Sequence, residues 1–520
     1  MIVPMDYASP SAFTSDGAGN AIGLCTNRRR PVRLHARVAR SHVLSVRMAL
    51  QALGELVWSN DSWLSDDEYF AIVLDPVITV HPDRVFFEAF SQDQSSYGVV
   101  IIDRSLLGCE GEVRHGTTNV DFTAWLWSAL GQLRSSRDTW LRVGPEGFAV
   151  QTVGAGGRFE AKVDLPESWV RGFLQMQSAA AMPGTRLRVR PVDLLSAIRF
   201  LRYTKANVSP RALRWVFEPG MDARLVLEPW EHSVPLRGAE HTYAEMRTIR
   251  VWGRRRLKRI EPLLPFASAV RVYLKGRALP SFYAVDLQPG VTFVLGLSGW
   301  TGNAWTRTGG FDMLSLSDAP ESGDTDAALR VLEQRHAMDV ASIAERCGFD
   351  LRRAERAVMR LCRQGRAIFD IERREVRHRE LFEEPPDEAR LFPPDPRREA
   401  TLRLVRTNQV HVTGVSVRET HKVRRLKAPD GPVERAMTYR EWQVDGRAEG
   451  QTSQIVVGDT GRIVFGTCSC AFFRENLLNM GPCEHMAALL FASDHARTDL
   501  PSSVRLDRSS SEPEGDWRDA

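Results

Sequence analysis

The chain has 520 residues, which is too long for one ordinary hydrophobic core and predicts roughly three or more domains. With 43% hydrophobic and 26% charged residues it has the composition of a soluble globular protein, and no apolar run of about 18 residues predicts a membrane span. The net charge of +4 is small, so nucleic-acid binding would have to come from local clusters. Scattered cysteines and the lack of a signal-peptide core predict a cytoplasmic protein.

The N-terminal part predicts a leader followed by a mixed domain. Residues 1–24 are mostly small and polar, so we expect a flexible leader. Residues 25–182 predict an α+β domain, in which apolar residues at three- and four-residue steps favour a helix over 41–57. Strand-like apolar runs follow this helix at 70–74, 84–90 and 97–102.

A second α+β domain is predicted over residues 183–316, after a break at Ala179-Ala180-Ala181-Met182-Pro183-Gly184. A helix near 192–202 precedes several runs in which apolar and polar residues alternate. That alternation is typical of sheets with one solvated face. The basic run 254–259 is interpreted either as a solvated helix start or as a surface for an anionic partner.

A compact helical pattern occupies residues 325–382, after a linker rich in Ser, Asp, Pro and Gly. Amphipathic helices are predicted at 326–336, 340–346 and 350–364, and two short alternating strands follow. Three helices and a β-hairpin in so short a stretch resemble a winged helix-turn-helix.

The third of these helices carries basic residues on the face opposite its apolar side chains. The residues of this arginine face are Arg352, Arg353, Arg356, Arg360 and Arg363. In a DNA-reading domain such a face enters the major groove, with arginines on phosphates and guanine edges. Winged helices also dock other proteins, and acidic residues lie among these arginines, so both interpretations stay open.

A small C-terminal domain is predicted over residues 397–497, after a Pro-rich linker. Its predicted strands lie near 410–417, 436–444 and 454–457. A second basic cluster lies on the hairpin between the first two strands: Lys422, Arg424, Arg425 and Lys427. If the chain binds nucleic acid, these residues are predicted to contact phosphate. Residues 501–520 are rich in Ser, Asp, Glu and Arg and predict a disordered tail.

Four good metal ligands fall close together in this domain. Cys468-Ser469-Cys470 is followed, after twelve residues, by Cys483-Glu484-His485. Two thiolates one residue apart can face one point, and the second pair adds a thiolate and an imidazole. Because Cys468, Cys470, Cys483 and His485 form a closed Cys₃His set, we predict one structural Zn²⁺ ion. The alternative, three reduced buried cysteines and an unrelated histidine, needs a fourfold coincidence of residue type and spacing.

The Cys-x-Cys, spacer, Cys-x-His pattern, with an apolar helix after the histidine, resembles the SWIM zinc finger. Ala471 stands where a proline often follows, and Glu484 where a basic residue often sits, but neither change removes a ligand. Residues 90–97, 209–215 and 296–301 are similar to stretches of long bacterial members of this family. Such members associate with MoxR-type AAA+ ATPases and von Willebrand A-domain proteins, so the resemblance implies protein partners of this kind.

No motif predicts an enzyme. The sequence lacks the phosphate-binding Gly-x-x-x-x-Gly-Lys-Ser/Thr loop, His-Glu-x-x-His and Gly-x-Ser-x-Gly, and a Cys₃His zinc has no open coordination position for hydrolysis. We therefore expect an α+β multidomain, non-enzymatic, zinc-binding adaptor built from two α+β blocks, a winged helix-turn-helix-like module and a SWIM domain. The alternative is a DNA- or RNA-binding protein that uses the arginine face and the zinc finger.

Overall fold

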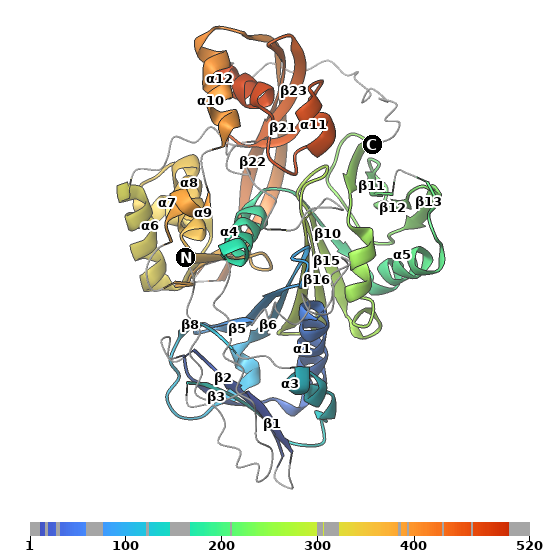
Figure 1. Cartoon of the computed structure of the whole chain (residues 1–520), viewed down its shortest axis with the longest axis vertical. Helices are drawn as coiled ribbons and strands as arrows, with labels where there is room; N and C mark the ends of the chain where they lie inside the picture. Colours follow the sequence, from blue (N-terminus) through green and yellow to red (C-terminus); the bar gives the residue numbers. More distant parts are fainter. Residues whose placement is uncertain are drawn as a thin grey trace.

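The structure is a computed structural model. It describes residues 11–15, 19–27, 32–58, 76–120, 124–145, 167–208, 211–298, 305, 322–382, 386–392, 395–428, 431–458 and 461–498. The elements are arranged along one long axis, with the N-terminal strands at one end and the C-terminal domain at the other (Figure 1). Within the described residues, no helix is long and apolar enough to cross a membrane. The strand expected at 70–74 and the tail at 501–520 lie outside the described residues.

A five-stranded sheet forms the N-terminal end. Its order is β1 (Ala12–Ser15), β2 (Asn20–Cys25), β9 (Thr139–Gly144), β3 (Leu34–Val38) and β7 (Leu107–Cys109). β2 runs parallel to β9, and the other neighbours are antiparallel. Strands β1 and β2 replace part of the flexible leader expected over residues 1–24. β9, the partner of β2, lies far along the chain, so local composition could not reveal this pairing.

The central element is an antiparallel eight-stranded sheet. Its order is β10 (Thr185–Val189), β15 (Ala269–Leu274), β16 (Ser281–Gln288), β17 (Val291–Leu297), β6 (Ser96–Asp103), β5 (Arg84–Phe90), β4 (Val77–Val80) and β8 (Gly116–Asn119). The strands expected at 84–90 and 97–102 are confirmed as β5 and β6. β6 pairs with β17, so the two α+β blocks predicted as separate units share one sheet.

Two helices cover the two faces of this sheet. Helix α1 (Val43–Val57), the helix expected at 41–57, packs on the face that carries Phe87 and Phe293. Helix α4 (Glu167–Ala181) packs on the face that carries Phe86. Neighbouring residues of one strand thus enter different cores, because side chains alternate across a sheet. The central strands are therefore buried on both sides, and their sequences are nearly continuous apolar runs.

A smaller unit flanks the central sheet. Its four-stranded sheet has the order β13 (His232–Pro235), β12 (Arg224–Leu227), β11 (Leu213–Phe217) and β14 (Arg247–Val251). Helix α5 (Pro191–Tyr203) packs beside it, and the basic run forms a 3-10 segment, Arg254–Arg259. Arg254, Arg256 and Arg259 are buried, which differs from the solvated helix start considered above. Burial, together with Arg211 and Arg255, lowers the pKa of Arg254 to about 10.

The helices and hairpin expected over 325–382 are present. The elements are α6 (Ser322–Arg335), β18 (Ala337–Met338), α7 (Val340–Cys347), α8 (Leu351–Arg363), β19 (Ala367–Asp370) and β20 (Glu375–His378). Asp339 and Asp350 cap α7 and α8 by accepting backbone N–H bonds from Ser342 and Arg353. Gly348 ends α7 at a φ of +68°. The interpretation of this unit as a winged helix stays a prediction.

Buried ion pairs join this unit to the central sheet. Arg379, just after β20, contacts Glu88 of β5 at 2.7 Å, and both side chains are fully buried. Arg377 contacts Asp370 at 2.9 Å within the hairpin, and Asp370 also accepts a hydrogen bond from Arg84 of β5 at 3.0 Å. The β19–β20 hairpin is therefore held against the sheet by charges that are removed from water.

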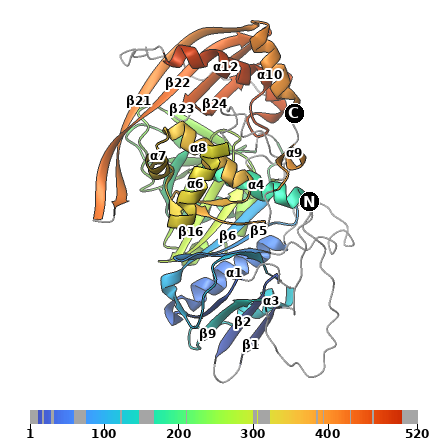
Figure 2. The same ribbon diagram turned by 90° about the vertical axis from the view of Figure 1, so that its left-hand side faces the viewer.

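The C-terminal domain packs one long helix on its sheet and a second helix against the first. Its elements are α9 (Glu388–Leu391), α10 (Pro396–Arg406), β21 (Val410–Ala428), β22 (Gly431–Ala448), β23 (Gln451–Gly458), β24 (Ile463–Cys468), α11 (Ala471–Asn476) and α12 (Glu484–Thr498). The strand order is β21-β22-β23-β24. Strands β21 and β22 are much longer than expected and extend past β23 as a two-stranded ribbon (Figure 2).

Candidate metal centre

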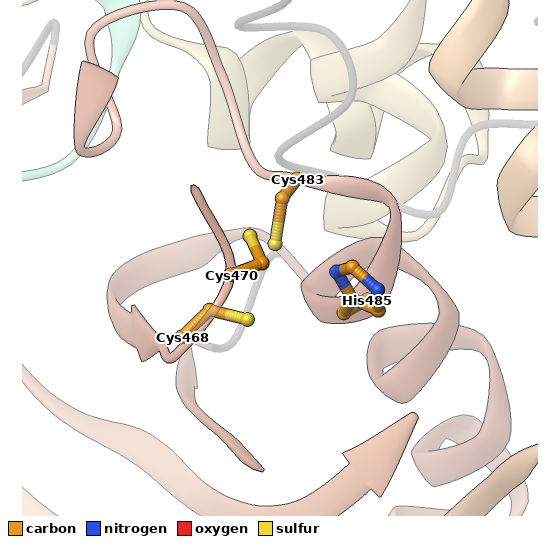
Figure 3. Close-up of side chains that lie close together, drawn as sticks. All are labelled: Cys468, Cys470, Cys483 and His485. Carbon is orange, nitrogen blue, oxygen red and sulfur yellow. The ribbon is translucent and has the colours of Figure 1, made fainter. Parts of the chain in front are cut away.

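The four predicted ligands come together at the junctions between β24, α11 and α12. Cys468 ends β24, Cys470 caps α11, Cys483 directly precedes α12, and His485 lies in the first turn of α12. All four side chains are buried, and their ligand atoms lie within 4.8 Å of one another. The three sulfur atoms and the imidazole ring are turned toward a common point (Figure 3). The predicted cluster is therefore confirmed.

Hydrogen bonds to sulfur prepare two of the cysteines for metal binding. Ser453 lies directly opposite Cys468 in the β23–β24 pair, and its hydroxyl donates to the Cys468 Sγ at 3.1 Å. The backbone N–H of Phe473 donates to the Cys470 Sγ at 3.4 Å. The pKa of the Cys468 thiol lies well below its ordinary value and that of the Cys483 thiol well above it, because the three sulfurs share hydrogen bonds and titrate together. The thiolate is the form of cysteine that binds metal.

The donor set fits one zinc ion. The Nδ1 atom of His485 is buried and has no hydrogen-bond partner within the described part of the chain, which is costly unless the atom binds something. Cys468, Cys470 and Cys483 are crowded together but are free thiols, not disulfides. Three sulfurs and one imidazole nitrogen are the ligands of a closed structural zinc site. The ion would link β24 to the start of α12 and leave no position open for a substrate.

Helix α10 supports the second ligand pair. The Arg397 Nη1 donates to the carbonyl oxygen of Pro482 at 2.9 Å, one residue before Cys483. The Arg397 guanidinium also lies 4.5 Å from the ring centre of Phe472 in α11. The sequence analysis missed Arg397 and Ser453, because neither lies within the ligand motif and no local pattern links α10 to a loop about 85 residues away.

Replacement of Arg397 should loosen the site without removing a ligand. We expect Arg397→Ala to lower zinc affinity about 10- to 100-fold, the usual effect of losing a residue that orients metal ligands. The measurement is zinc competition with a chromogenic chelator, using the intact chain. Arg398→Ala, at the exposed neighbouring position, is the matched control. Equal affinities in the two variants would show that Arg397 does not position the ligands.

The geometry of the centre agrees with its sequence family. Residues 453–494 match the SWIM zinc finger. The match begins in β23, includes all four ligands and ends within α12. This SWIM zinc finger is a small part of the 520-residue chain, and a search of curated proteins found no match to the chain.

Two solved structures show a weak likeness to about half of the chain. They are PCNA from Thermococcus kodakaraensis and A. fulgidus PCNA bound to the C-terminal region of FEN-1. Each is 11% identical to this chain and covers 51% of it, with a TM-score of 0.32. The matches cover 98% and 97% of those chains, respectively. A TM-score this low does not establish a shared fold.

The arginine face of α8 lies against other parts of the chain. All five of its arginines are half-buried. Arg353 forms a bidentate ion pair with Asp324 of α6, with 2.6 Å between Nε and a carboxylate oxygen. The Arg363 guanidinium lies over the ring of Phe392, 4.5 Å from the ring centre. Arg352 lies 3.7 Å from Asp494 of α12. The prediction that this face contacts nucleic acid stays untested, but three of its arginines already have partners within the protein.

The second predicted basic cluster lies on the long ribbon. Lys422, Arg424, Arg425 and Lys427 belong to β21, and their backbones pair with residues 432–437 of β22. Their side chains lie outside the described part of the structure. Contact of this cluster with phosphate therefore stays a prediction.

Proposed function

We propose that this chain is a non-enzymatic, zinc-binding adaptor whose SWIM zinc finger presents a recognition surface to a protein partner. The observation that carries the proposal is the buried, closed Cys₃His cluster at the centre of the C-terminal domain. A closed site is suited to holding a fold together rather than to catalysis. Its cysteines pack in the same hydrophobic cluster as Tyr97 and Phe282 of the central sheet, so bound zinc would hold the finger on a rigid support.

The proposed partner class comes from the resemblance to long bacterial SWIM proteins. We propose a MoxR-type AAA+ ATPase or a von Willebrand A-domain protein in the cytoplasm, within a multi-protein assembly. The several packed sheets would then act as a frame for recognition surfaces, and the ATPase would supply the chemical step.

Purification of the assembly from cells tests the adaptor role. We expect the tagged full chain to co-purify with an AAA+ ATPase, and the purified ATPase to rebind the isolated chain. His485→Ala should lose this rebinding, because it removes a ligand from the cluster. Cys109→Ser, which replaces an exposed cysteine far from the cluster, should keep it. If the ATPase bound both variants equally, the zinc finger would not take part in the interaction.

A second candidate function is DNA or RNA binding, and the β21–β22 ribbon is the observation that favours it. The ribbon carries Lys422, Arg424, Arg425 and Lys427 beyond the edge of β23. Two-stranded ribbons fit the major groove of B-DNA. The double variant Arg356→Glu with Arg360→Glu tests the arginine face of α8. Duplex binding by the unaltered chain that is lost in this variant would favour nucleic-acid binding.

A further inference from the structure

The five-stranded sheet has one buried and one exposed face. Along β3, Leu34, Ala36 and Val38 are buried, whereas Arg33 and Arg37 on the alternate positions are exposed. In β9, Leu141 and Val143 are likewise buried, and Arg142 between them is exposed. Because side chains alternate across a strand, the basic residues share the face that points away from the core. This face lies at the opposite end of the molecule from the zinc finger (Figures 1 and 2).

A hollow of about 250 Å³ lies on this face. Gly23, Arg142 and His35 are direct neighbours across strands β2, β9 and β3. Gly23 has no side chain, so the row is low at its β2 end, and Arg142 stands at its centre. Gly144 and Arg33 also line the hollow. The lining thus combines two exposed guanidinium groups and an imidazole with the apolar residues Leu24, Leu34 and Val143. The guanidinium groups make the hollow suited to an anion.

Aromatic rings adjoin the hollow. The Arg142 Nε donates to the His35 Nε2 at 3.1 Å. The ring centre of His35 lies 5.1 Å from that of Trp140, with 37° between the planes, and both rings are half-buried. Asp138, a nearby acid, is held by Arg40 through two hydrogen bonds of 2.8 and 3.0 Å. Glu110 is a second nearby acid, because its backbone N–H donates to the His35 carbonyl oxygen at 2.8 Å. The exposed residues Arg33, Arg37 and Arg142 outnumber it, so the face combines net positive charge with a partly exposed aromatic surface.

We propose that this face binds a nucleotide phosphate in the hollow, between Arg33 and Arg142, with the attached base on the His35 and Trp140 rings. Single-stranded nucleic acid and free nucleotides share this chemistry. Proteins that bind single strands combine the same two features, a cationic surface for the backbone and aromatic rings for the bases. The site is distinct from the zinc-dependent adaptor surface and goes beyond that function.

The test measures binding of a fluorescein-labelled twelve-nucleotide oligo-dT to the intact, zinc-loaded chain by fluorescence anisotropy across a salt series. Arg33→Glu with Arg142→Glu should lower affinity at least about tenfold. The same variant should reduce the slope of log K against log salt by about 0.7, since the hollow holds one phosphate and each neutralised phosphate on a single strand contributes roughly that much. Trp140→Leu should lower affinity about tenfold through lost stacking, with an unchanged salt slope.

Arg188→Glu with Lys205→Glu, two exposed cations of the neighbouring unit, is the charge-matched control and should bind like the unaltered chain. Thermal unfolding and zinc content, equal in all variants, exclude misfolding. Displacement of the oligonucleotide by AMP at equal nucleotide concentration assigns the site to free nucleotides, and weak displacement assigns it to single strands. The proposal is overturned if the intact chain does not bind at low salt, if the Arg33/Arg142 variant matches the control, or if duplex DNA binds equally well.

Discussion

Cys468→Ser is expected to abolish zinc binding and to unfold the C-terminal domain. Apparent zinc-binding free energies of structural sites are about 10–16 kcal/mol, which equals or exceeds the whole stability of a typical domain, roughly 5–15 kcal/mol. The ligands join β24 to α12, and Met486 and Leu489 of α12 lie in the same core as the cysteines. Without zinc, buried thiols and an orphaned imidazole would remain in that core.

Zinc per chain, measured by atomic emission, and thermal unfolding of the purified protein check this expectation. His485→Ala should behave like Cys468→Ser, and limited proteolysis should cut both variants within residues 397–497. Cys109→Ser serves as the matched control, because its thiol is exposed and lies outside the cluster. Unchanged zinc content and unchanged melting temperature in the two ligand variants would disprove a structural role for the site.

Arg379→Ala is expected to lower the free energy of unfolding by about 3–5 kcal/mol, the usual effect of removing one partner of a buried ion pair. Arg379 and Glu88 are both fully buried, with 2.7 Å between Nη1 and Oε2. In the variant, the Glu88 carboxylate stays out of water without its counter-charge. Among the described residues, the other donors to Glu88 are the hydroxyl of Tyr97, at 2.7 Å, and the more distant amide of Gln177, at 3.4 Å.

Urea unfolding followed by circular dichroism measures this effect. Arg403→Ala is the matched control, because Arg403 pairs with Glu449 at 3.5 Å on the surface and such pairs contribute about 0–1 kcal/mol. Arg379→Met combined with Glu88→Leu should recover most of the loss, since apolar residues of similar volume often replace a buried pair without penalty. A loss in Arg379→Ala no larger than in the control would show that the pair does not hold the hairpin to the sheet.

Local features of the structure could be predicted from the sequence. The four zinc ligands were found because a closed site needs particular residue types at short spacings, and Cys468-x-Cys470 and Cys483-x-His485 satisfy that need locally. The ends of α7 and α8 were also predictable, since Asp339, Gly348 and Asp350 act on the backbone within a few residues of themselves.

Tertiary structure alone decided what depends on pairing between distant segments. Strand β2 joins the N-terminal sheet through β9, which lies far along the chain, and β6 joins the two predicted blocks through β17. The same holds for the site on the exposed face, where Gly23, His35 and Arg142 become neighbours through the strand order. Hydrophobic pattern determines which residues of a strand are buried together, but it does not specify which strand lies next to it, because backbone hydrogen bonds are the same for every partner.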